Sequence, residues 1–509
     1  MYQHDPATGP APCAVVVVAG SDLTCADVVA VARQSHPVAL HADGRRRAAQ
    51  SHALAEHIVS SRSVYGRTTG VGANRVLDVG ADEPGHGLRL LRSHASGTGP
   101  LEPTDRVRAA MVVRLNQLAA GGSGVAPDLL DALEAALLAG AVPALHRLGS
   151  IGTGDLCALA ELGLTLCGDL PWRSGGTAPV PLTNTDALAL ISSNAVTIGE
   201  AVLAYHDLTV LLAASEVVAG LSFLALGGAA EAYGAPVQGA RAHPGQVLVA
   251  QRLRALLGLG VTSRPGRRLQ DTFSLRAVPQ VHGTAVDALA HLGSTLAVEV
   301  NARAENPLID VGTGEAWHNA NFHTGYLAHA LDGARSAIYP VAELSAARLG
   351  DLVDPDFTDL PAFLADGPPG SSGVMALEFV AHDGVASLRH ASLPATLGSA
   401  VISRGLEDHA SFSTQAARLA STAVPALRVV LAAELVAAVR ALAMRDGPDA
   451  GYPIRSAYEL ACTALDPDVA DRPLSADLEV AGRLLDGYGV SPPLPEQPGD
   501  EARTPPRHR

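Results

Sequence analysis

Five long apolar segments with helical spacing constrain the fold of this chain more than any other feature. They all follow residue 180 and cover residues 187–226, 284–302, 325–349, 375–390 and 414–444. Hydrophobic residues make up 48% of the chain but aromatic residues only 4%, and Ala and Leu dominate. Such a composition suits closely packed helices better than sheets. We therefore predict a mainly α protein with a long central helical bundle.

A Pro- and Gly-rich connection at residues 171–181 marks the expected domain boundary. We predict an N-terminal domain at residues 13–180 and a central and C-terminal helical bundle at residues 181–490. Prolines break up residues 1–12, which we predict to be a leader. Residues 491–509 are rich in prolines set among charges, so a disordered tail is expected there.

Charge and cysteine placement argue against several classes of function. The formal net charge is −15, and the chain contains no Lys. Nucleic acids and anionic membranes bind basic surfaces, so we expect neither as a partner. The most apolar run, residues 208–226, contains Glu216, which favours a buried core helix over a membrane span. The five cysteines have neither paired nor metal-ligand spacing, which predicts a cytoplasmic protein without a metal site.

A glycine-punctuated loop, Gly149-Ser-Ile-Gly-Thr-Gly-Asp-Leu156, precedes a further apolar helical run. Its glycines permit positive φ angles and close approach of the chain, and Asp155 stands where a helix cap is expected. The loop has no Lys and no Walker spacing, which argues against phosphate binding. By itself, such a loop is most often only a turn.

Six further motifs accompany this loop in a fixed order. They lie at residues 64–72, 92–97, 270–276, 299–307, 321–323 and 407–409. In this order and spacing they resemble the aromatic amino acid ammonia-lyase family, which contains histidine, phenylalanine and tyrosine ammonia-lyases and the related aminomutases. The resemblance implies a histidine ammonia-lyase-like fold. So many long apolar helices need partners, and we therefore predict a homotetramer; the resemblance adds that active sites of this family are built from more than one chain.

The resemblance assigns roles to individual residues. Tyr65 matches the family tyrosine proposed as the base, and Arg276 matches the arginine that binds the substrate carboxylate with its forked guanidinium. An interhelical salt bridge is the structural alternative for Arg276. A phenol with a pKa of about 10 needs a nearby positive charge or donor to act as a base at neutral pH. The predicted catalytic residues are Tyr65, Arg276 and Glu407, and the predicted substrate-binding residues are His94, Ser192, Asn194, Gln270, Phe273, Asn321 and Phe322.

Three departures from the family fall in the same site. The family forms an electrophilic methylidene-imidazolone group (MIO) from an Ala-Ser-Gly triplet, whereas Gly152, Thr153 and Gly154 take that place here, in a loop one residue shorter. The family's active-site Asn falls on Ser192, and its second active-site tyrosine falls on Phe273. Thr153 could dehydrate to an ethylidene analogue, but its extra methyl group and the shorter loop hinder ring closure. We therefore expect neither MIO nor its analogue, and no other cofactor.

Three hypotheses of function follow for a small-molecule substrate. The first is an MIO-independent lyase that catalyses dehydration, conjugate (Michael-type) addition with cyclisation, or both on a natural-product intermediate. A hydrogen α to a carbonyl group is already acidic, so a base and an anion clamp suffice. The second is an ammonia-lyase or aminomutase that acts on histidine or another aromatic amino acid through a Thr-derived group. The third is a non-catalytic homologue.

Overall fold

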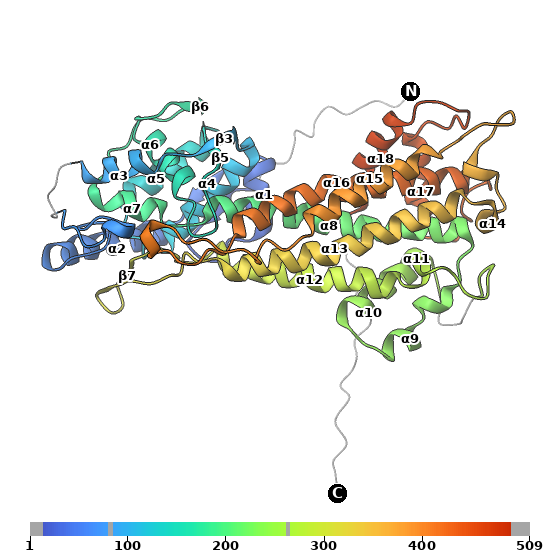
Figure 1. Cartoon of the computed structure of the whole chain (residues 1–509), viewed down its shortest axis with the longest axis horizontal. Helices are drawn as coiled ribbons and strands as arrows, with labels where there is room; N and C mark the ends of the chain where they lie inside the picture. The colour runs from blue at the N-terminus through green and yellow to red at the C-terminus, as the bar shows by residue number, and fades with distance from the viewer. Residues whose placement is uncertain (1–13, 80–84, 261–264, 490–509) are drawn as a thin grey trace, which may run out of the picture. The chain divides into compact units, whose positions relative to one another are not determined.

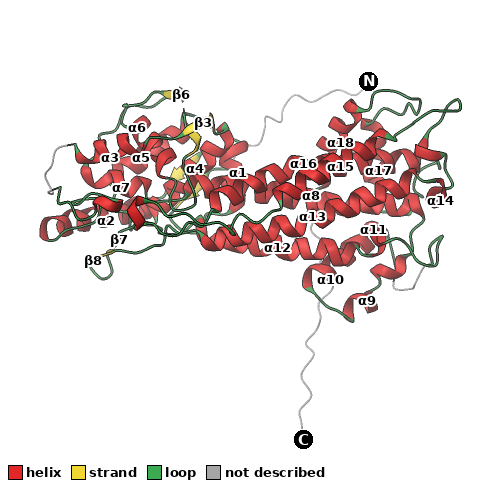
Figure 2. Cartoon of the chain, viewed as in Figure 1, coloured by secondary structure: helices red, strands yellow, loops and turns green. Residues whose placement is uncertain are grey.

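A computed structural model of the chain describes residues 14–79, 85–260 and 265–489. Figure 1 labels its elements, and Figure 2 shows that helices dominate these residues while the strands are short. The expected mainly α class is therefore confirmed. The predicted leader, residues 1–12, and the predicted tail, residues 491–509, lie outside the described residues.

The helices range from single turns to long rods. They are α1 (Cys25–Arg33), α2 (Ala42–Ser61), α3 (His86–His94), α4 (Thr104–Ala119), α5 (Pro127–Leu138), α6 (Leu156–Leu166), α7 (Asn184–Ile191), α8 (Ala195–Leu226), α9 (Ala235–Gly239), α10 (Pro244–Leu256), α11 (Phe273–Arg276), α12 (Val278–Glu299), α13 (Gly325–Val353), α14 (Pro355–Thr358), α15 (Ala376–Ala391), α16 (Ser413–Ala443), α17 (Arg455–Ala464) and α18 (Ser475–Tyr488). Four of the predicted apolar segments correspond to α12, α13, α15 and α16, with ends that differ by a few residues. The helix α16 continues through Pro425, where the sequence predicts a kink.

The described strands pair two by two. The strands β1 (Val16–Val18) and β2 (Val38–Leu40) are parallel. The antiparallel pairs are β3 (Thr98–Leu101) with β5 (His146–Leu148), β4 (Val142–Pro143) with β6 (Trp172–Ser174), and β7 (Leu308–Asp310) with β8 (Glu315–Trp317). These short strand pairs connect loops between the helices. The β7–β8 hairpin ends at Trp317, one residue before His318.

The chain forms two compact units, each discontinuous in sequence. Unit 1 comprises Met1–Leu208, Asp287–Tyr339 and Ala386–Ala426, and unit 2 comprises the remaining residues. The linear division predicted near residue 180 stays a prediction.

The predicted segment 187–226 is two helices rather than one. The helix α7 ends at Ile191, α8 begins at Ala195, and three polar residues lie between them. The Ser193 hydroxyl accepts a hydrogen bond from the Ala195 amide at 3.0 Å, so a side chain replaces the helical backbone partner at this point. The break exposes Ser192 to the cavity described below.

Unit 1 is organised around α4, which is buried on nearly all sides from Val107 to Ala119. The fully buried Arg114 of this helix pairs with Glu305 at 3.0 Å. It also donates to the carbonyl oxygens of Ala189 and Leu190, at the end of α7. This pairing satisfies a buried charge and fixes the chain that leads into the α7–α8 break. The helices α3, α6 and α7 pack against one another beside it (Figure 1).

Unit 2 contains a fully buried ion pair between Arg348 of α13 and Glu434 of α16, at 2.6 Å. Ser222 of α8 and Ser345 donate to the same carboxylate, each at 2.6 Å. Arg348 also donates to the carbonyl oxygen of Ser274 at 2.9 Å, which fixes α11. The network thus holds together three helices of unit 2 and the short helix that carries Arg276.

Two helical spans, Asn184–Leu226 and Ser413–Ala443, are long and apolar enough to cross a membrane by length and composition alone. In their most apolar stretches, 78% and 72% of the residues are buried inside the protein. Such burial is typical of the core helices of a large bundle.

Candidate active site

A cavity of about 790 Å³ in unit 1 brings together many of the predicted site residues. Its walls include Tyr65, His94, Ser192, Phe322 and Glu407, together with Thr153 and Gly154 of the glycine-rich loop. These side chains come from six separate parts of the sequence. Residues far apart in the chain thus converge on one space that can hold a small molecule.

The Tyr65 loop is held by its own hydrogen bonds. The Val64 amide donates to the Thr68 hydroxyl at 2.8 Å, and the Gly72 amide donates to the Tyr65 hydroxyl at 2.7 Å. Gly72 has a φ of 57°, and a side chain there would collide with the Ser403 hydroxyl at 2.4 Å. Glycine is therefore required at this position so that the loop can turn beside the cavity.

Burial raises the pKa of Tyr65, despite the Gly72 amide and Arg75, which both act to lower it. The negative charge of Glu407 adds to the rise. The donor expected from the sequence is therefore present, but desolvation of the phenolate outweighs it. Because its pKa is raised, Tyr65 keeps its proton at neutral pH.

Glu407 lies in the same cavity, half-buried, and burial raises the pKa of its carboxyl group. His94 partly offsets this rise. The His94 ring is fixed at the end of α3 because its Nδ1 bonds the Leu90 carbonyl oxygen at 2.9 Å. The raised pKa of Glu407 brings its carboxylate closer to the basicity that suits a general base near neutral pH.

The Gly152–Gly154 triplet is tied down by buried side chains. The Gly152 carbonyl oxygen accepts from the Ser411 hydroxyl at 2.7 Å and from the Thr324 hydroxyl at 3.4 Å. The Gly154 amide donates to Asn194 Oδ1 at 3.0 Å. Gly152 has a φ of 81°, and a Cβ atom there would lie 2.2 Å from the Ser411 hydroxyl. These contacts hold Thr153 at the cavity wall.

Asp155 occupies the N-cap position of α6, as predicted, but its side chain makes no capping hydrogen bond to that helix. Its carboxylate instead accepts from the amide and the hydroxyl of Thr197, each at 2.8 Å. Thr197 lies in the first turn of α8, whose unpaired amides attract a carboxylate just as those of α6 would. Asp155 therefore joins the glycine-rich loop to the second helix after the break.

A series of polar contacts forms the opposite wall. The backbone amide of Asn306 donates to the Ser192 hydroxyl at 3.0 Å, and the backbone amide of Asn319 donates to Asn306 Oδ1 at 2.9 Å. The backbone amide of Asn321 continues the series by donating to Asn319 Oδ1 at 2.8 Å. The Asn321 side chain does not line the cavity. Asn194 is buried behind the loop, where it also donates to the Phe322 carbonyl oxygen. Asn194 and Asn321 thus support the cavity from behind.

His318 is a cavity residue that sequence reasoning did not find. Its Nε2 accepts a hydrogen bond from the Tyr65 amide at 3.2 Å. Burial, together with the charge of Arg62, lowers its pKa below the usual 6.5. No motif or spacing in the sequence singles it out. Asn306 and Asn319 were missed as well, although Asn306 stands inside one of the seven motifs.

Three predicted residues belong to unit 2 instead. Gln270, Phe273 and Arg276 line a separate cavity of about 500 Å³. The Arg276 guanidinium lies 4.2 Å from the centre of the Phe273 ring, a cation–π distance. In the described part of the chain no carboxylate forms an ion pair with Arg276, so the salt-bridge alternative is not observed. Those predicted residues that line a cavity therefore fall into two groups, one in each cavity.

Within residues 14–79, 85–260 and 265–489, no cluster of three or more His, Cys, Asp or Glu side chains could hold a metal ion.

The chain is similar to known proteins over nearly its whole length. The family profile described as aromatic amino acid lyase matches residues 23–463. The histidine ammonia-lyases of Symbiobacterium thermophilum and Geobacillus thermodenitrificans are each 35% identical to it; the alignments cover 92% of this chain and 96% and 97% of the relatives.

Solved structures show the same similarity. Ergothionase from Treponema denticola, an ergothioneine-degrading enzyme, superposes with a TM-score of 0.87 at 25% identity, over 93% of this chain and 99% of that one. Tyrosine aminomutase from Streptomyces globisporus superposes with a TM-score of 0.85 at 29% identity, over 93% and 97%.

Proposed function

Because this chain belongs to the aromatic amino acid lyase family, we propose that it catalyses an elimination on a small molecule in the unit 1 cavity, with Tyr65 and Glu407 as its acid–base pair. The family match confirms the resemblance carried by the motifs and the histidine ammonia-lyase-like fold. The observation that carries the proposal is the convergence of Tyr65, Glu407 and the glycine-rich loop on one cavity.

We further propose that the reaction proceeds without MIO. A five-membered ring made from three residues must join the amide nitrogen of the third to the carbonyl carbon of the first. Closing it would consume the Gly154 N–H and expel the Gly152 carbonyl oxygen. The Asn194 side-chain oxygen would then lose its donor and the Ser411 hydroxyl its acceptor, whereas Thr324 would lose a 3.4 Å contact but keep its bond with the Ser413 hydroxyl.

These three side chains are nearly inaccessible to water, at 0%, 4% and 1% exposure. A buried polar group without a partner costs roughly 1–3 kcal/mol, so ring closure would lose several favourable contacts. We take these contacts as support for an unmodified, open peptide at the triplet. No step of the proposed reaction uses MIO.

The proposed chemistry is removal of water from a β-hydroxy carbonyl compound. The Glu407 carboxylate takes the α-hydrogen, and the electrons of the C–H bond form an enolate. The enolate then forms the carbon–carbon double bond while the β-hydroxyl leaves with the Tyr65 proton as water. The sequence suggests Tyr65 as the base, but its raised pKa keeps it protonated at neutral pH, so we assign it the role of donor and Glu407 that of acceptor.

The enolate and the substrate's acidic group need a cation. Arg276 is the proposed clamp, and because active sites built from more than one chain are what the family resemblance implies, we propose that it comes from another copy of the chain in a homotetramer. The forked N–H donors of a guanidinium suit a planar anion such as a carboxylate or an enolate. This assignment keeps the sequence-based role of Arg276. A cytoplasmic location likewise stays a prediction.

The relatives favour a second candidate. Two relatives with 35% identity are named histidine ammonia-lyase, so elimination of ammonia from an aromatic amino acid is the alternative, and it would need a group derived from Thr153. The two candidates differ in whether the chain is modified and in the leaving group.

Intact-mass spectrometry together with a substrate panel tests the proposal. We expect the unprocessed chain mass and formation of an α,β-unsaturated product from a β-hydroxy-β-phenylpropionyl thioester of N-acetylcysteamine. We expect no ammonia release from L-histidine, L-phenylalanine or L-tyrosine. A mass deficit of two waters that maps to Gly152–Gly154, with ammonia release, would establish the second candidate instead.

A further inference from the structure

The His318 ring binds the main chain of the residue proposed as the proton donor. The Tyr65 amide donates to Nε2 of His318 at 3.2 Å. A ring nitrogen that accepts a hydrogen bond carries no hydrogen of its own, so this contact requires the neutral tautomer with its hydrogen on Nδ1. In the protonated ring, an N–H group at Nε2 would face the Tyr65 N–H, and two donors would oppose each other.

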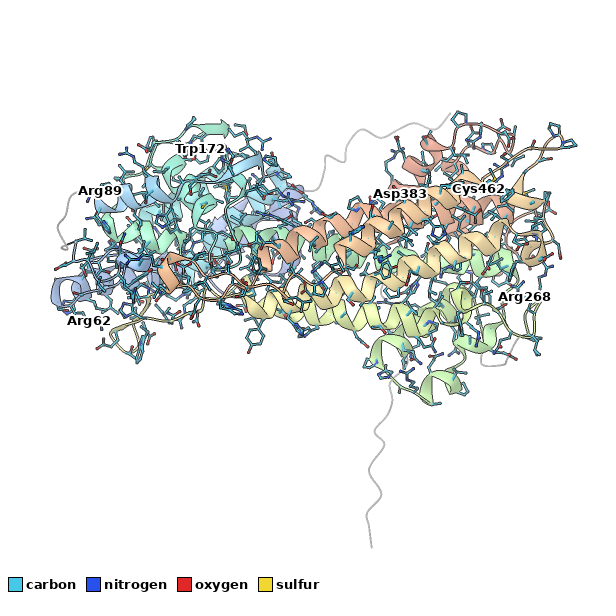
Figure 3. All side chains as sticks on the ribbon, in the orientation of Figure 1. Arg62, Arg89, Trp172, Arg268, Asp383 and Cys462 are labelled. Atoms are coloured by element: carbon cyan, nitrogen blue, oxygen red, sulfur yellow. The ribbon has the colours of Figure 1, made fainter. Side chains whose placement is uncertain are left out.

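The fold brings this pair together by fastening two elements to each other. Arg62 is the C-cap of α2 (labelled in Figure 3) and stands three residues before Tyr65. Its guanidinium donates to the Ala316 carbonyl oxygen at 2.7 Å and pairs with Glu315 at 3.1 Å. Both of these partners lie on β8, which ends just before His318. The end of α2 and the end of the hairpin are therefore joined next to the His318–Tyr65 bond.

We propose that His318 is a positioning residue: its neutral ring fixes the Tyr65 main chain, and thereby the loop that presents the Tyr65 hydroxyl to the cavity, and protonation of the ring releases this loop. The consequence for turnover rests on the proposed function. The consequence for the loop does not.

The charges around His318 set the pH at which the contact is lost. Burial lowers its pKa first, and the positive charge of Arg62 adds to this. Glu315 on β8 is paired with Arg62, and Tyr65, Arg75, His94 and Glu407 are the other titratable groups that line the cavity. A lowered pKa favours the neutral ring, so the contact holds at neutral pH and is lost as the pH falls through a value below 6.5.

Hydrogen exchange measured by mass spectrometry on the full-length protein tests the contact without a substrate. The measured quantity is the protection of the peptide that covers residues 63–72, corrected for the intrinsic pH dependence of exchange. His318→Leu removes the acceptor, whereas His318→Gln places an amide oxygen near the position of Nε2 and cannot titrate. His57→Gln is the control, since His57 is exposed on α2.

We expect the Tyr65 amide to lose about fivefold or more of its protection in His318→Leu at every pH, because a hydrogen bond of ordinary strength corresponds to that factor. Wild type and His57→Gln should lose the same protection only at acidic pH, and His318→Gln should keep it throughout. Equal exchange in all four proteins, or loss at acidic pH that persists in His318→Gln, would overturn the proposal. Thermal unfolding midpoints that agree with wild type show that each variant is folded.

Turnover of the thioester provides a second readout. His318→Leu should lower kcat about 10-fold or more with a smaller effect on KM, because a misplaced catalytic group slows the chemical step more than binding. In His318→Gln one of the two titrations on the acidic side is removed and that of Glu407 remains, so the acidic limb of the pH profile should become less steep or move to lower pH. A limb unchanged in both steepness and position contradicts the role of His318. If Tyr65→Phe is silent while the exchange results hold, the proposed function fails and the positioning contact stands.

Discussion

Tyr65 and Glu407 share one cavity, and the role of each can be separated by isotope exchange. Tyr65→Phe removes a proton donor that contributes about 10²–10⁴-fold in rate, so elimination from the thioester should fall by roughly that factor. If Glu407 is the base, this variant should still exchange the α-hydrogen of the substrate in heavy water. Glu407→Gln should lose both exchange and elimination. Mass spectrometry of recovered substrate measures the exchange.

The opposite pattern assigns the roles as the sequence suggests. Loss of α-hydrogen exchange in Tyr65→Phe, with retention in Glu407→Gln, would make Tyr65 the base in spite of its raised pKa. Unchanged turnover in both variants would place the chemistry outside this cavity.

Thr153 distinguishes an open loop from a modified one. Thr153→Ala removes the only hydroxyl of the Gly152–Gly154 triplet that could be eliminated, but leaves the bonds to Gly152 and Gly154 intact. If the loop is unmodified, as proposed, the variant should keep its turnover within about a factor of three, because a surface-lining methyl and hydroxyl contribute little. Ser411→Ala is an informative comparison because it loosens the loop without touching Thr153. Loss of all activity in Thr153→Ala would support the ammonia-lyase alternative.

At the scale of residues, the motifs predict which residues line the cavity better than they predict which hydrogen bonds those residues make. Tyr65, His94 and Glu407 carry motif signals, and the structure brings them to one cavity. His318 carries no signal because its role depends on one bond from its ring to the Tyr65 main chain, across a large separation in sequence. Asp155 shows a related limit, since sequence indicates that a carboxylate will bind helix amides but not which helix offers them.

At the scale of elements, helical periodicity identified the long apolar helices but not the break between α7 and α8. The apolar positions on both sides of the polar residues 192–194 keep helical spacing, and at the break Ser193 and Asn194 bond the Ala195 amide and other parts of the fold. Local propensity is a weak signal when tertiary partners are available for the same polar groups. The element most relevant to function was thus the one least visible in the sequence.

The buried ion pair of unit 2 permits a stability prediction. Glu434→Gln leaves Arg348 buried at 0% exposure without a counter-charge, which should lower the free energy of unfolding by about 3–5 kcal/mol. The matched control is Glu459→Gln in α17, whose partner Arg455 is 40% exposed, and a pair of this kind contributes about 0.3–0.5 kcal/mol. Urea unfolding followed by circular dichroism measures both. Equal midpoints for the two variants would contradict the structural role of the buried pair.

At the scale of the whole molecule, the chain presents large apolar side chains that its own fold does not cover. Phe273, Tyr326 and Leu397 are 67%, 85% and 84% exposed in the single chain. Exposed apolar groups of this size are typical of surfaces that bind another protein. They support the predicted homotetramer, which light scattering at micromolar concentration would test directly. A fully active monomer would exclude it.

Mixing of inactive variants tests whether active sites combine residues from different copies. Tyr65 lies in the cavity of unit 1 and Arg276 in that of unit 2. If each site takes Tyr65 from one chain and Arg276 from another, then Tyr65→Phe and Arg276→Ala chains that are unfolded together in equal amounts and refolded should form some sites with both residues intact. Random assembly makes about a quarter of the sites complete, so about a quarter of wild-type turnover should return, although each parent is nearly inactive.

The control for this experiment mixes Tyr65→Phe with Glu407→Gln. These two residues line the same cavity of one chain, so every site in the mixture lacks at least one of them and turnover should stay at the level of the parents. Recovery in the first mixture but not in the second requires that Arg276 and Tyr65 meet only in the oligomer. Failure of both mixtures to recover, with light scattering showing mixed tetramers, would mean that Arg276 serves the site of its own chain or none at all.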